Sequence, residues 1–527
     1  MMNLSTLKTL FLTTVFMLFG CLAIQAQVFI YPTKGLNIEI KLDEAGTLPD
    51  RIEHIKDDIS ELKIIGEING TDLDVIREMA GGINQGGYQT DGILSVLDLS
   101  EARIVKGGHY FILSSNYSTS KDKIGEYVFY GCSSLTSITL PPHVTEIGNS
   151  AFYGCRGLTS LTLPSGVTKI GNSAFSGCRG LTSLTLPSGV TKIGSSAFEG
   201  CIGLTSLTIP SGVTEIGSSA FKDCTDLTSL SLPSGITEIG SSAFEDCRGL
   251  TSLTIPSGVT EIGSSAFKGC TGLTSLSLPS GVTEIGSSAF EDCRGLTSLS
   301  LPSGITKIGS SIFYGCSGLT SLTLPSSITE IGSYAFGGCS GLTSLTLPSG
   351  ITEIDSDAFK GCTGLKDVNF YINGDFETYL KKNHPRIGVG CGIKYYLNDE
   401  EITSIVVPSS VTTLGMYAFQ RCSNLLSVYV SWPTPISAYK TFSETNLGKC
   451  TLYVPQGKEQ DYWLADVWGD FGNIVEYDPT GIDRVTTSTD AKELSRYSVN
   501  GQRLSAPAKG LNIVKYSDGS VKKVVVQ

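Results

Sequence analysis

Residues Gly157–Cys178 read GLTSLTLPSGVTKIGNSAFSGC, and this stretch decides the fold. Almost the same letters recur from residue 125 to residue 371 at a constant step of 23 residues. A fixed period of this length is typical of a solenoid, in which each repeat buries its apolar face only by stacking on its neighbours. We therefore predict a repeat solenoid of eleven consecutive coils. Cysteines mark the step without an insertion: Cys132, Cys155, Cys178, Cys201, Cys224, Cys247, Cys270, Cys293, Cys316, Cys339 and Cys362.

Within one repeat the apolar residues fall into three short groups separated by turns. Leu161 and Leu163 alternate with hydroxyl residues, which predicts a short strand with leucines inward and hydroxyls outward. The Pro-Ser-Gly turn at residues 164–166 ends this strand. A second apolar group contains Ile170, and a third contains Phe175 and the cysteine that follows it. We expect a β-rich, right-handed stack of coils with parallel strand ladders.

The phenylalanine and the cysteine of the third group keep one position in every repeat. A fixed inward position favours a buried ladder of small apolar side chains over a set of disulfides. Side chains stacked in parallel have the wrong relative geometry for disulfides, and eleven cysteines cannot all pair. We predict free thiols. The structural core ladder includes Phe175, Cys178, Phe198, Cys201, Phe221 and Cys224.

The repeat unit LTSLTLPSGVTxIGxxAFxGCxG resembles the leucine-rich repeat of BspA-like proteins, which occur on bacterial cell surfaces. The resemblance extends over the repeats almost letter for letter. It implies a leucine-rich-repeat solenoid with a parallel sheet along one face. It also implies adhesion, with host extracellular-matrix proteins or other bacteria as partners.

The remaining chain does not keep the step of 23 residues, except at residues 399–430, where a twelfth repeat returns. We interpret residues 27–124 as an N-terminal cap, with a helix over residues 73–80. Residues 372–398 read as an irregular insertion that contains a helix over residues 376–382. A C-terminal cap is expected over residues 431–479.

Residues 480–527 read as a polar linker followed by a small β domain. Three short strands are expected there, within residues 497–526, with turns at Asn500-Gly501 and Asp518-Gly519. The segment resembles the carboxy-terminal domains of Bacteroidetes surface proteins. Some of those domains are sorting signals for export, and the resemblance implies this role here.

Residues 1–26 read as an export signal, because Lys8 precedes an apolar run over residues 10–22. Two processing routes fit the sequence. Cleavage after Ala26 would leave Gln27 as the new amino terminus. Lipidation at Cys21, in a Leu-Phe-Gly-Cys sequence like a bacterial lipobox, would instead anchor the protein. In both cases we expect a protein exported to the cell surface or secreted.

Net charge and composition exclude several kinds of partner. The net charge of −12 argues against nucleic acid, which requires a basic surface, and against an anionic membrane. We expect membrane contact only through a lipid anchor, and a monomer in solution. The chain contains no CxxC, and its four histidines (His54, His109, His143 and His384) lie far apart, so we expect no metal and no cofactor.

The sequence contains no nucleophile elbow, P-loop or HExxH motif, so we expect no enzyme. The predicted function is interaction with an extracellular protein or glycan through the hydroxyl rows of the sheet face. One alternative is a structural spacer without a ligand, and a remote alternative is a glycosidase in the C-terminal cap. The candidate binding face consists of Thr162, Thr185, Thr208, Ser231, Thr254, Ser277, Ser300, Thr323 and Thr346. The glycosidase candidates are Asp461, Asp466, Asp470 and Glu476 near Trp463 and Trp468.

Overall fold

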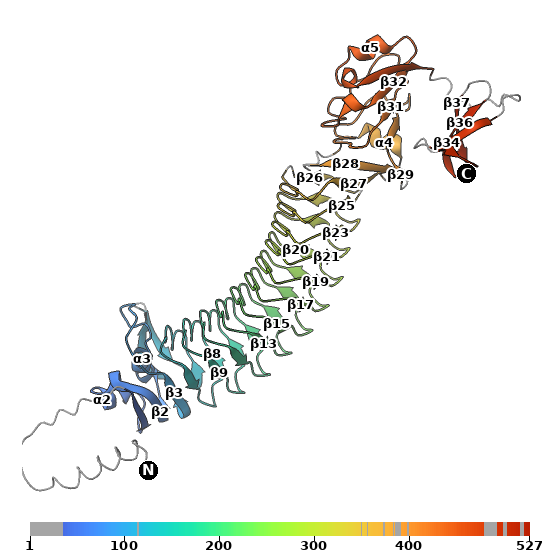
Figure 1. Ribbon diagram of the computed structural model, residues 1–527. Helices are drawn as coiled ribbons and strands as arrows, with labels where there is room; N and C mark the ends of the chain where they lie inside the picture. Colours follow the sequence, from blue (N-terminus) through green and yellow to red (C-terminus); the bar gives the residue numbers. More distant parts are fainter. Residues whose placement is uncertain are drawn as a thin grey trace, which may run out of the picture.

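The structure is a computed structural model, and it is a curved rod of stacked coils (Figure 1). The expected signal peptide with Cys21, and residues 479–492, lie outside the described residues. The structure describes residues 35–112, 115–348, 350–355, 357–372, 375–382, 384, 391–397, 400–478, 493–498, 503–507, 509–516 and 521–526.

The N-terminal segment begins the main sheet of the rod. Its strands β1, β2 and β3 pair in parallel, and β3 pairs with the first repeat strand, β7. Helix α3 begins after Asn69, whose side chain forms a capping box with Asp72, and it lies where the sequence predicts a helix. The elements are β1 (Leu36–Leu42), α2 (Leu48–Ile52), η1 (Lys56–Asp58), β2 (Ile59–Ile68), α3 (Gly70–Met79), β3 (Val96–Ile104), β4 (Gly107–Ile112), β5 (Ser115–Thr119) and β6 (Lys123–Ile124).

Each regular repeat contributes two short strands to two ladders. The longer strand pairs in parallel with the strand one repeat away, so that Leu161 pairs with Leu184. The shorter strand does the same on another side of the coil, where Ile170 pairs with Ile193. The predicted solenoid with parallel ladders is therefore confirmed. The longer strands are β7 (Ser137–Thr139), β9 (Ser160–Thr162), β11 (Ser183–Thr185), β13 (Ser206–Thr208), β15 (Ser229–Ser231), β17 (Ser252–Thr254), β19 (Ser275–Ser277), β21 (Ser298–Ser300), β23 (Ser321–Thr323) and β25 (Ser344–Leu347). The shorter ones are β8 (Glu146–Ile147), β10 (Lys169–Ile170), β12 (Lys192–Ile193), β14 (Glu215–Ile216), β16 (Glu238–Ile239), β18 (Glu261–Ile262), β20 (Glu284–Ile285), β22 (Lys307–Ile308), β24 (Glu330–Ile331) and β26 (Glu353–Ile354).

The core follows the axis of the rod. The phenylalanines stack ring on ring from Phe129 to Phe359; the rings of Phe175 and Phe198, for example, have centroids 5.6 Å apart and planes 3° apart. These rings and the inward leucines are almost completely buried. Because each coil buries its apolar residues only against the next, the core is one continuous column rather than a central cluster.

Residues 372–398 differ from the predicted irregular insertion. Strand β28 (Gly392–Leu397) pairs in parallel with β27 (Asp367–Ile372), so the chain completes another coil of the same sheet. Between these strands lies helix α4 (Phe376–Lys381), at the position predicted for a helix. The side chain of Asp375 caps this helix by accepting a hydrogen bond from the backbone amide of Thr378.

The C-terminal part of the rod has a four-stranded parallel sheet, and a separate four-stranded antiparallel sheet follows it in sequence. Three strands were predicted in the antiparallel sheet; the additional strand is β35, two residues long. Among the described residues, no helix is long and apolar enough to cross a membrane. The elements are β29 (Glu400–Glu401), β30 (Ser404–Val406), β31 (Ser427–Tyr429), η2 (Leu447–Lys449), β32 (Thr451–Pro455), α5 (Glu459–Trp463), η3 (Trp468–Asp470), β33 (Asn473–Tyr477), β34 (Glu493–Ser498), β35 (Arg503–Leu504), β36 (Gly510–Tyr516) and β37 (Val521–Val526).

Candidate binding face

The longer strands present their hydroxyl side chains to solvent. In β9, Ser160 and Thr162 are exposed and Leu161 between them is buried. The same exposed–buried–exposed pattern holds in the equivalent three-residue strands from β7 to β23, because successive side chains of a strand point to opposite faces. The nine predicted face residues are thus brought together in one line: Thr162, Thr185, Thr208, Ser231, Thr254, Ser277, Ser300, Thr323 and Thr346 are all exposed.

Not all hydroxyl rows are equally available to a ligand. The threonines just before the strands bond from coil to coil; the hydroxyl of Thr182, for instance, donates to the carbonyl of Thr159 at 3.2 Å. The hydroxyl of Thr297 donates likewise to the carbonyl of Thr274, at 3.4 Å. By contrast, the hydroxyls of the nine face residues have no hydrogen-bond partner among the described residues. This row can therefore both donate and accept towards an external molecule.

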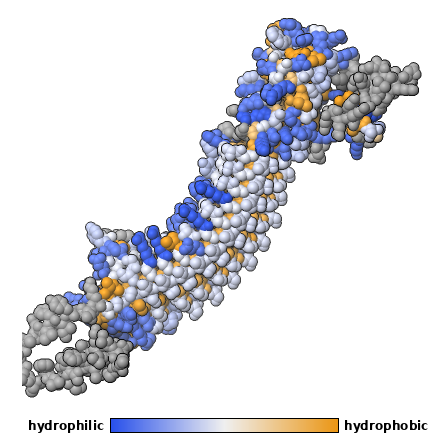
Figure 2. All heavy atoms as spheres, viewed as in Figure 1, coloured by the Kyte–Doolittle hydropathy of each residue, from blue (hydrophilic) through white to orange (hydrophobic). Residues whose placement is uncertain are grey.

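Charged side chains lie outside this face. Figure 2 shows strongly hydrophilic residues gathered along one edge of the solenoid, beside a surface of nearly neutral hydropathy. Ion pairs also link neighbouring coils outside the face, for example Lys222–Glu245, with 3.3 Å between nitrogen and oxygen, and Lys268–Glu291, at 2.9 Å. Exposed pairs of this kind contribute little stability, ~0–1 kcal/mol each. The face is thus free of charge along the longer strands β9 to β25.

A second charged row follows the shorter strands. Glu146 lies between Lys123 and Lys169, with 2.6 Å to each ammonium nitrogen. Hydrogen bonds from these two lysines lower the pKa of Glu146. Farther along, the same row has Glu215, Glu238, Glu261 and Glu284 in register without an intervening cation.

Replacing Glu238 with lysine is expected to stabilise the protein by about 0.5–1 kcal/mol. The new ammonium would lie between two carboxylates, as each lysine beside Glu146 lies near one. Urea unfolding at low salt measures the gain, which should shrink at about 1 M salt because the Debye length falls to ~3 Å. The control Glu238→Gln removes only the repulsion between neighbouring carboxylates, so its free energy of unfolding should rise by less. If Glu238→Lys were no more stable than Glu238→Gln, the expected attraction between the new lysine and the glutamates of the neighbouring coils would be contradicted.

The cysteine ladder has a structural position. Phe175, Cys178, Phe198, Cys201, Phe221 and Cys224 are all buried, and the described cysteines are free thiols. The thiol of Cys224 donates to the carbonyl of Phe198 at 3.1 Å. Burial raises the pKa of Cys224 to about 12, so the group is a neutral thiol at physiological pH. Neutral, solvent-shielded thiols are poor nucleophiles and poor metal ligands.

The carboxylates of the C-terminal cap have structural partners. Glu476 accepts a hydrogen bond from the backbone amide of Glu459 at 3.1 Å, and backbone hydrogen bonds lower its pKa. Asp461 pairs with Lys458 at 2.9 Å. A glycosidase requires one carboxyl group whose pKa is raised so that it can act as an acid. Glu476 has the opposite shift.

The tryptophans of the same cap do not form a shared platform. Trp468 is buried, and its indole nitrogen donates to the carbonyl of Ile436 at 2.7 Å. Trp463 is exposed. The other candidate acids, Asp466 and Asp470, lie exposed on the same segment.

One pair of aromatic side chains was not predicted from the sequence. Tyr130 and Tyr153 stack on each other at the N-terminal end of the repeats, with centroids 4.8 Å apart and planes 10° apart. A signal was available, because the residue after the ladder phenylalanine is tyrosine in two successive repeats and not in the third, which has Ser176.

Comparison with known proteins agrees with this geometry. The family model described as BspA type leucine-rich repeat region matches residues 112–225, 145–274, 261–379 and 392–458. No curated protein matches the chain.

Several solved bacterial structures are similar. A leucine-rich repeat protein from Bacteroides ovatus is 26% identical, with 71% of this chain and 87% of the other covered and a TM-score of 0.47. A leucine rich cell surface protein from Faecalibacterium prausnitzii is 30% identical, with 53% and 87% covered and a TM-score of 0.34. The T. pallidum leucine rich repeat protein is 34% identical, with 37% and 82% covered and a TM-score of 0.30. Because the family model matches more than half of the chain, the protein belongs to the BspA-type leucine-rich repeat family.

Proposed function

We propose that the protein is a non-catalytic adhesion scaffold, exported to the cell surface, that binds an extracellular protein or glycan through the row of Thr162 and its equivalents. The observation that carries this proposal is the difference between neighbouring hydroxyl rows. In the row that contains Thr159, the threonine hydroxyls form hydrogen bonds with backbone carbonyls of the neighbouring coil. In the row that contains Thr162, no hydroxyl has a hydrogen-bond partner among the described residues. A row of available donors and acceptors serves recognition rather than folding.

The geometry of the row suits repeated weak contacts. Neighbouring strands of a sheet lie about 4.8 Å apart, so equivalent hydroxyls recur at that spacing along the rod. Linking many weak contacts on one rigid surface raises the overall affinity without any strong single site. A fibrous matrix protein or a long glycan, which is itself repetitive, matches such a surface best.

The sequence at the amino terminus supports the proposed display outside the cell. Either cleavage after Ala26 or lipidation at Cys21 would deliver the solenoid to the surface, and only the second would hold it at a membrane. The net charge of −12 favours neither nucleic acid nor an anionic membrane as a ligand. We propose that the solenoid acts as a monomer, without a cofactor.

Charged substitutions on the face test this function. We expect a triple substitution by arginine to weaken adhesion of the full-length chain to immobilised collagen, laminin or fibronectin at least tenfold, because three bulky cations interrupt the hydroxyl row. Surface plasmon resonance measures the apparent affinity. The face variant combines Thr208→Arg, Thr254→Arg and Ser300→Arg. The matched control adds the same charge to exposed turns of the same three coils, through Ser218→Arg, Ser264→Arg and Ser310→Arg.

The outcomes separate adhesion from the alternative, a structural spacer. Loss of binding in the face variant alone supports adhesion through the row. Equal binding by both variants would contradict the assigned face, and no binding by the unaltered chain to any matrix protein or to a glycan array would favour a spacer without a ligand.

A further inference from the structure

A cavity of about 330 Å³ lies where the N-terminal segment meets the first repeats. It is separate from the hydroxyl row, since none of the face residues lines it. A volume of this size is at the lower end of the range for small-ligand sites, ~300–1,000 Å³. The side chains that line it are Ile83, Gln89, Tyr130, Ser133, Tyr153 and Arg156.

Two tyrosine rings supply its aromatic surface. The rings of Tyr130 and Tyr153, which belong to successive repeats, are nearly parallel and stack on each other. Tyr153 is 39% exposed. Burial raises the pKa of Tyr130, so this phenol is neutral. In the next two coils the equivalent residues are Ser176 and Glu199, so this pair of stacked rings does not continue into them. Flat, amphipathic rings of this kind bind the apolar face of a ligand while their hydroxyls stay in water.

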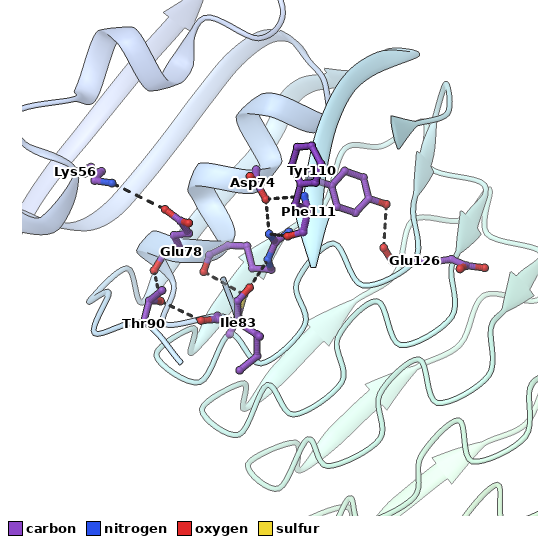
Figure 3. Close-up of polar contacts among 11 residues, drawn as sticks. Lys56, Asp74, Glu78, Ile83, Thr90, Tyr110, Phe111 and Glu126 are labelled. Atoms are coloured by element: carbon purple, nitrogen blue, oxygen red, sulfur yellow. Dashed lines mark hydrogen bonds and ion pairs between the residues drawn. The ribbon is translucent and has the colours of Figure 1, made fainter. Parts of the chain in front are cut away.

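The opposite wall is fixed before any ligand binds. The backbone amide of Ile83 donates to the carbonyl of Tyr130 at 3.1 Å, and the amide nitrogen of Gln89 donates to the carbonyl of Gly131 at 2.9 Å. Behind this wall, the guanidinium of the buried Arg77 donates through Nε to the carbonyl of Ile83 at 2.9 Å. Figure 3 shows the carbonyl side of Ile83 facing the cluster formed by Asp74 and Phe111. The cavity is therefore preformed, which reduces the entropy lost on binding.

A single charge lines the cavity, and it is positive. Arg156 is exposed and has no ion-pair partner among the described residues. Two arginines at the same repeat position are paired, Arg248 with Asp246 and Arg294 with Asp292, each at 3.1 Å. Arg179, one coil on, resembles Arg156 in having no ion pair among the described residues, but it does not line the cavity. An unpaired guanidinium in a cavity that also has an aromatic surface favours a carboxylate-bearing ligand.

We propose that this cavity binds one six-membered sugar ring that carries a carboxylate, at the end of an acidic glycan. The apolar face of the ring packs against the exposed part of the Tyr153–Tyr130 stack, and the carboxylate pairs with Arg156. The side-chain oxygen of Gln89 remains to accept from a ring hydroxyl. The hydroxyl of Ser133 is already engaged, because it accepts from the side-chain nitrogen of Gln89 at 3.2 Å and donates to the carbonyl of Gly81 at 3.4 Å. A uronic acid and a sialic acid share this chemistry. The assignment goes beyond the adhesion face and does not depend on it.

Saturation-transfer NMR and calorimetry on the full-length chain test the assignment with three probes. The probes are the methyl glycosides of glucuronic acid, of glucose and of N-acetylneuraminic acid. We expect at least one acidic glycoside to bind at least fivefold more tightly than the glucoside, and comparison of the two acids identifies the source of the carboxylate. Equal binding of the acidic and neutral glycosides, or binding of none, would overturn the proposal.

The variants use substitutions that introduce residues found at the equivalent position of other repeats. Tyr153→Ser introduces the residue found at this position in the next coil, and Arg156→Thr introduces a residue found after other ladder cysteines, so both should fold. Each should weaken binding of the acidic glycoside at least fivefold. The controls are Arg179→Thr, at the equivalent position one coil on, and Tyr314→Ser, at another exposed tyrosine outside the cavity.

The controls decide between a built site and general surface effects. Binding that is unchanged in Arg179→Thr and Tyr314→Ser but lost in the two cavity variants supports the site. Equal losses in Arg156→Thr and Arg179→Thr would show attraction to a diffuse positive surface and would overturn it. Thermal unfolding of each variant verifies that the coils remain stacked.

Discussion

Replacing Phe244 with alanine is expected to lower the free energy of unfolding by about 4 kcal/mol, within the ~3–5 kcal/mol usual for a buried phenylalanine. Phe244 is fully buried, and its ring stacks between Phe221, at 5.5 Å, and Phe267, at 5.4 Å. Its removal leaves a cavity bordered by two stiff neighbouring coils that are held by backbone ladders. The site therefore has little freedom to collapse.

The position in the middle of the column adds a second effect. In a solenoid, stability is approximately a sum of repeat terms and nearest-neighbour terms, so a weak interface in the middle divides one cooperative unit into two. We expect the urea transition of Phe244→Ala, followed by circular dichroism, to move to lower urea and to broaden. The exposed control Thr254→Ala, in the following coil, should change stability by less than ~0.5 kcal/mol. A loss below 1 kcal/mol for Phe244→Ala would contradict a tightly coupled core.

The period of the sequence was sufficient to predict the regular part of the fold. A step without insertions requires each residue to stack on its equivalent one repeat away, and this is the register observed, for example Leu184 on Leu161. The alternation of apolar and hydroxyl residues gave the direction of each side chain, because the period of a strand is two. Neither inference needs any knowledge of distant contacts.

The coil at residues 372–398 was misinterpreted for a physical reason. Its strand β28 keeps the inward alternation through Ile393 and Tyr395, as the preceding strand β27 does through Val368 and Phe370. The letters of the repeat are lost, however, and helix α4 between the strands changes the length of the coil. A search for the residue types of the repeat does not detect such a coil, whereas a search for the alternation of inward and outward residues would have detected its strands.

The difference between hydroxyl rows could not be predicted from composition. Thr159 and Thr162 are the same residue type three positions apart, and both are exposed. Only the path of the backbone between coils places the hydroxyl of Thr159 near the carbonyl of Thr136, at 3.3 Å. The cavity beside Tyr153 was equally inaccessible, since it needs the loop that carries Ile83 to fold back on the first repeats.

Replacing Arg77 with methionine is expected to destabilise the N-terminal end of the rod by about 3–5 kcal/mol, the usual result of removing one partner from a buried charged network. Arg77 is completely buried in α3. Its guanidinium donates to the carbonyls of Ile83, at 2.9 Å, and Phe111, at 2.7 Å, and pairs with Asp74 (Figure 3). Methionine fills a similar volume but leaves these acceptors without their donor.

The loss of stability in Arg77→Met should extend from the N-terminal end of the rod into the first repeats and no farther. Arg77 joins α3 to the β4–β5 hairpin and to the loop at Ile83, and these elements cover the open end of the first repeat. Without that cover we expect faster amide hydrogen exchange in β3 and in the first repeats, and unchanged exchange beyond the middle of the column. The control Arg103→Met removes an exposed arginine whose contact with Asp122 is 3.4 Å long, and should cost less than ~1 kcal/mol. Uniformly faster exchange along the whole solenoid would contradict a local cap, because it would mean that the coils unfold as one unit rather than from an uncovered end.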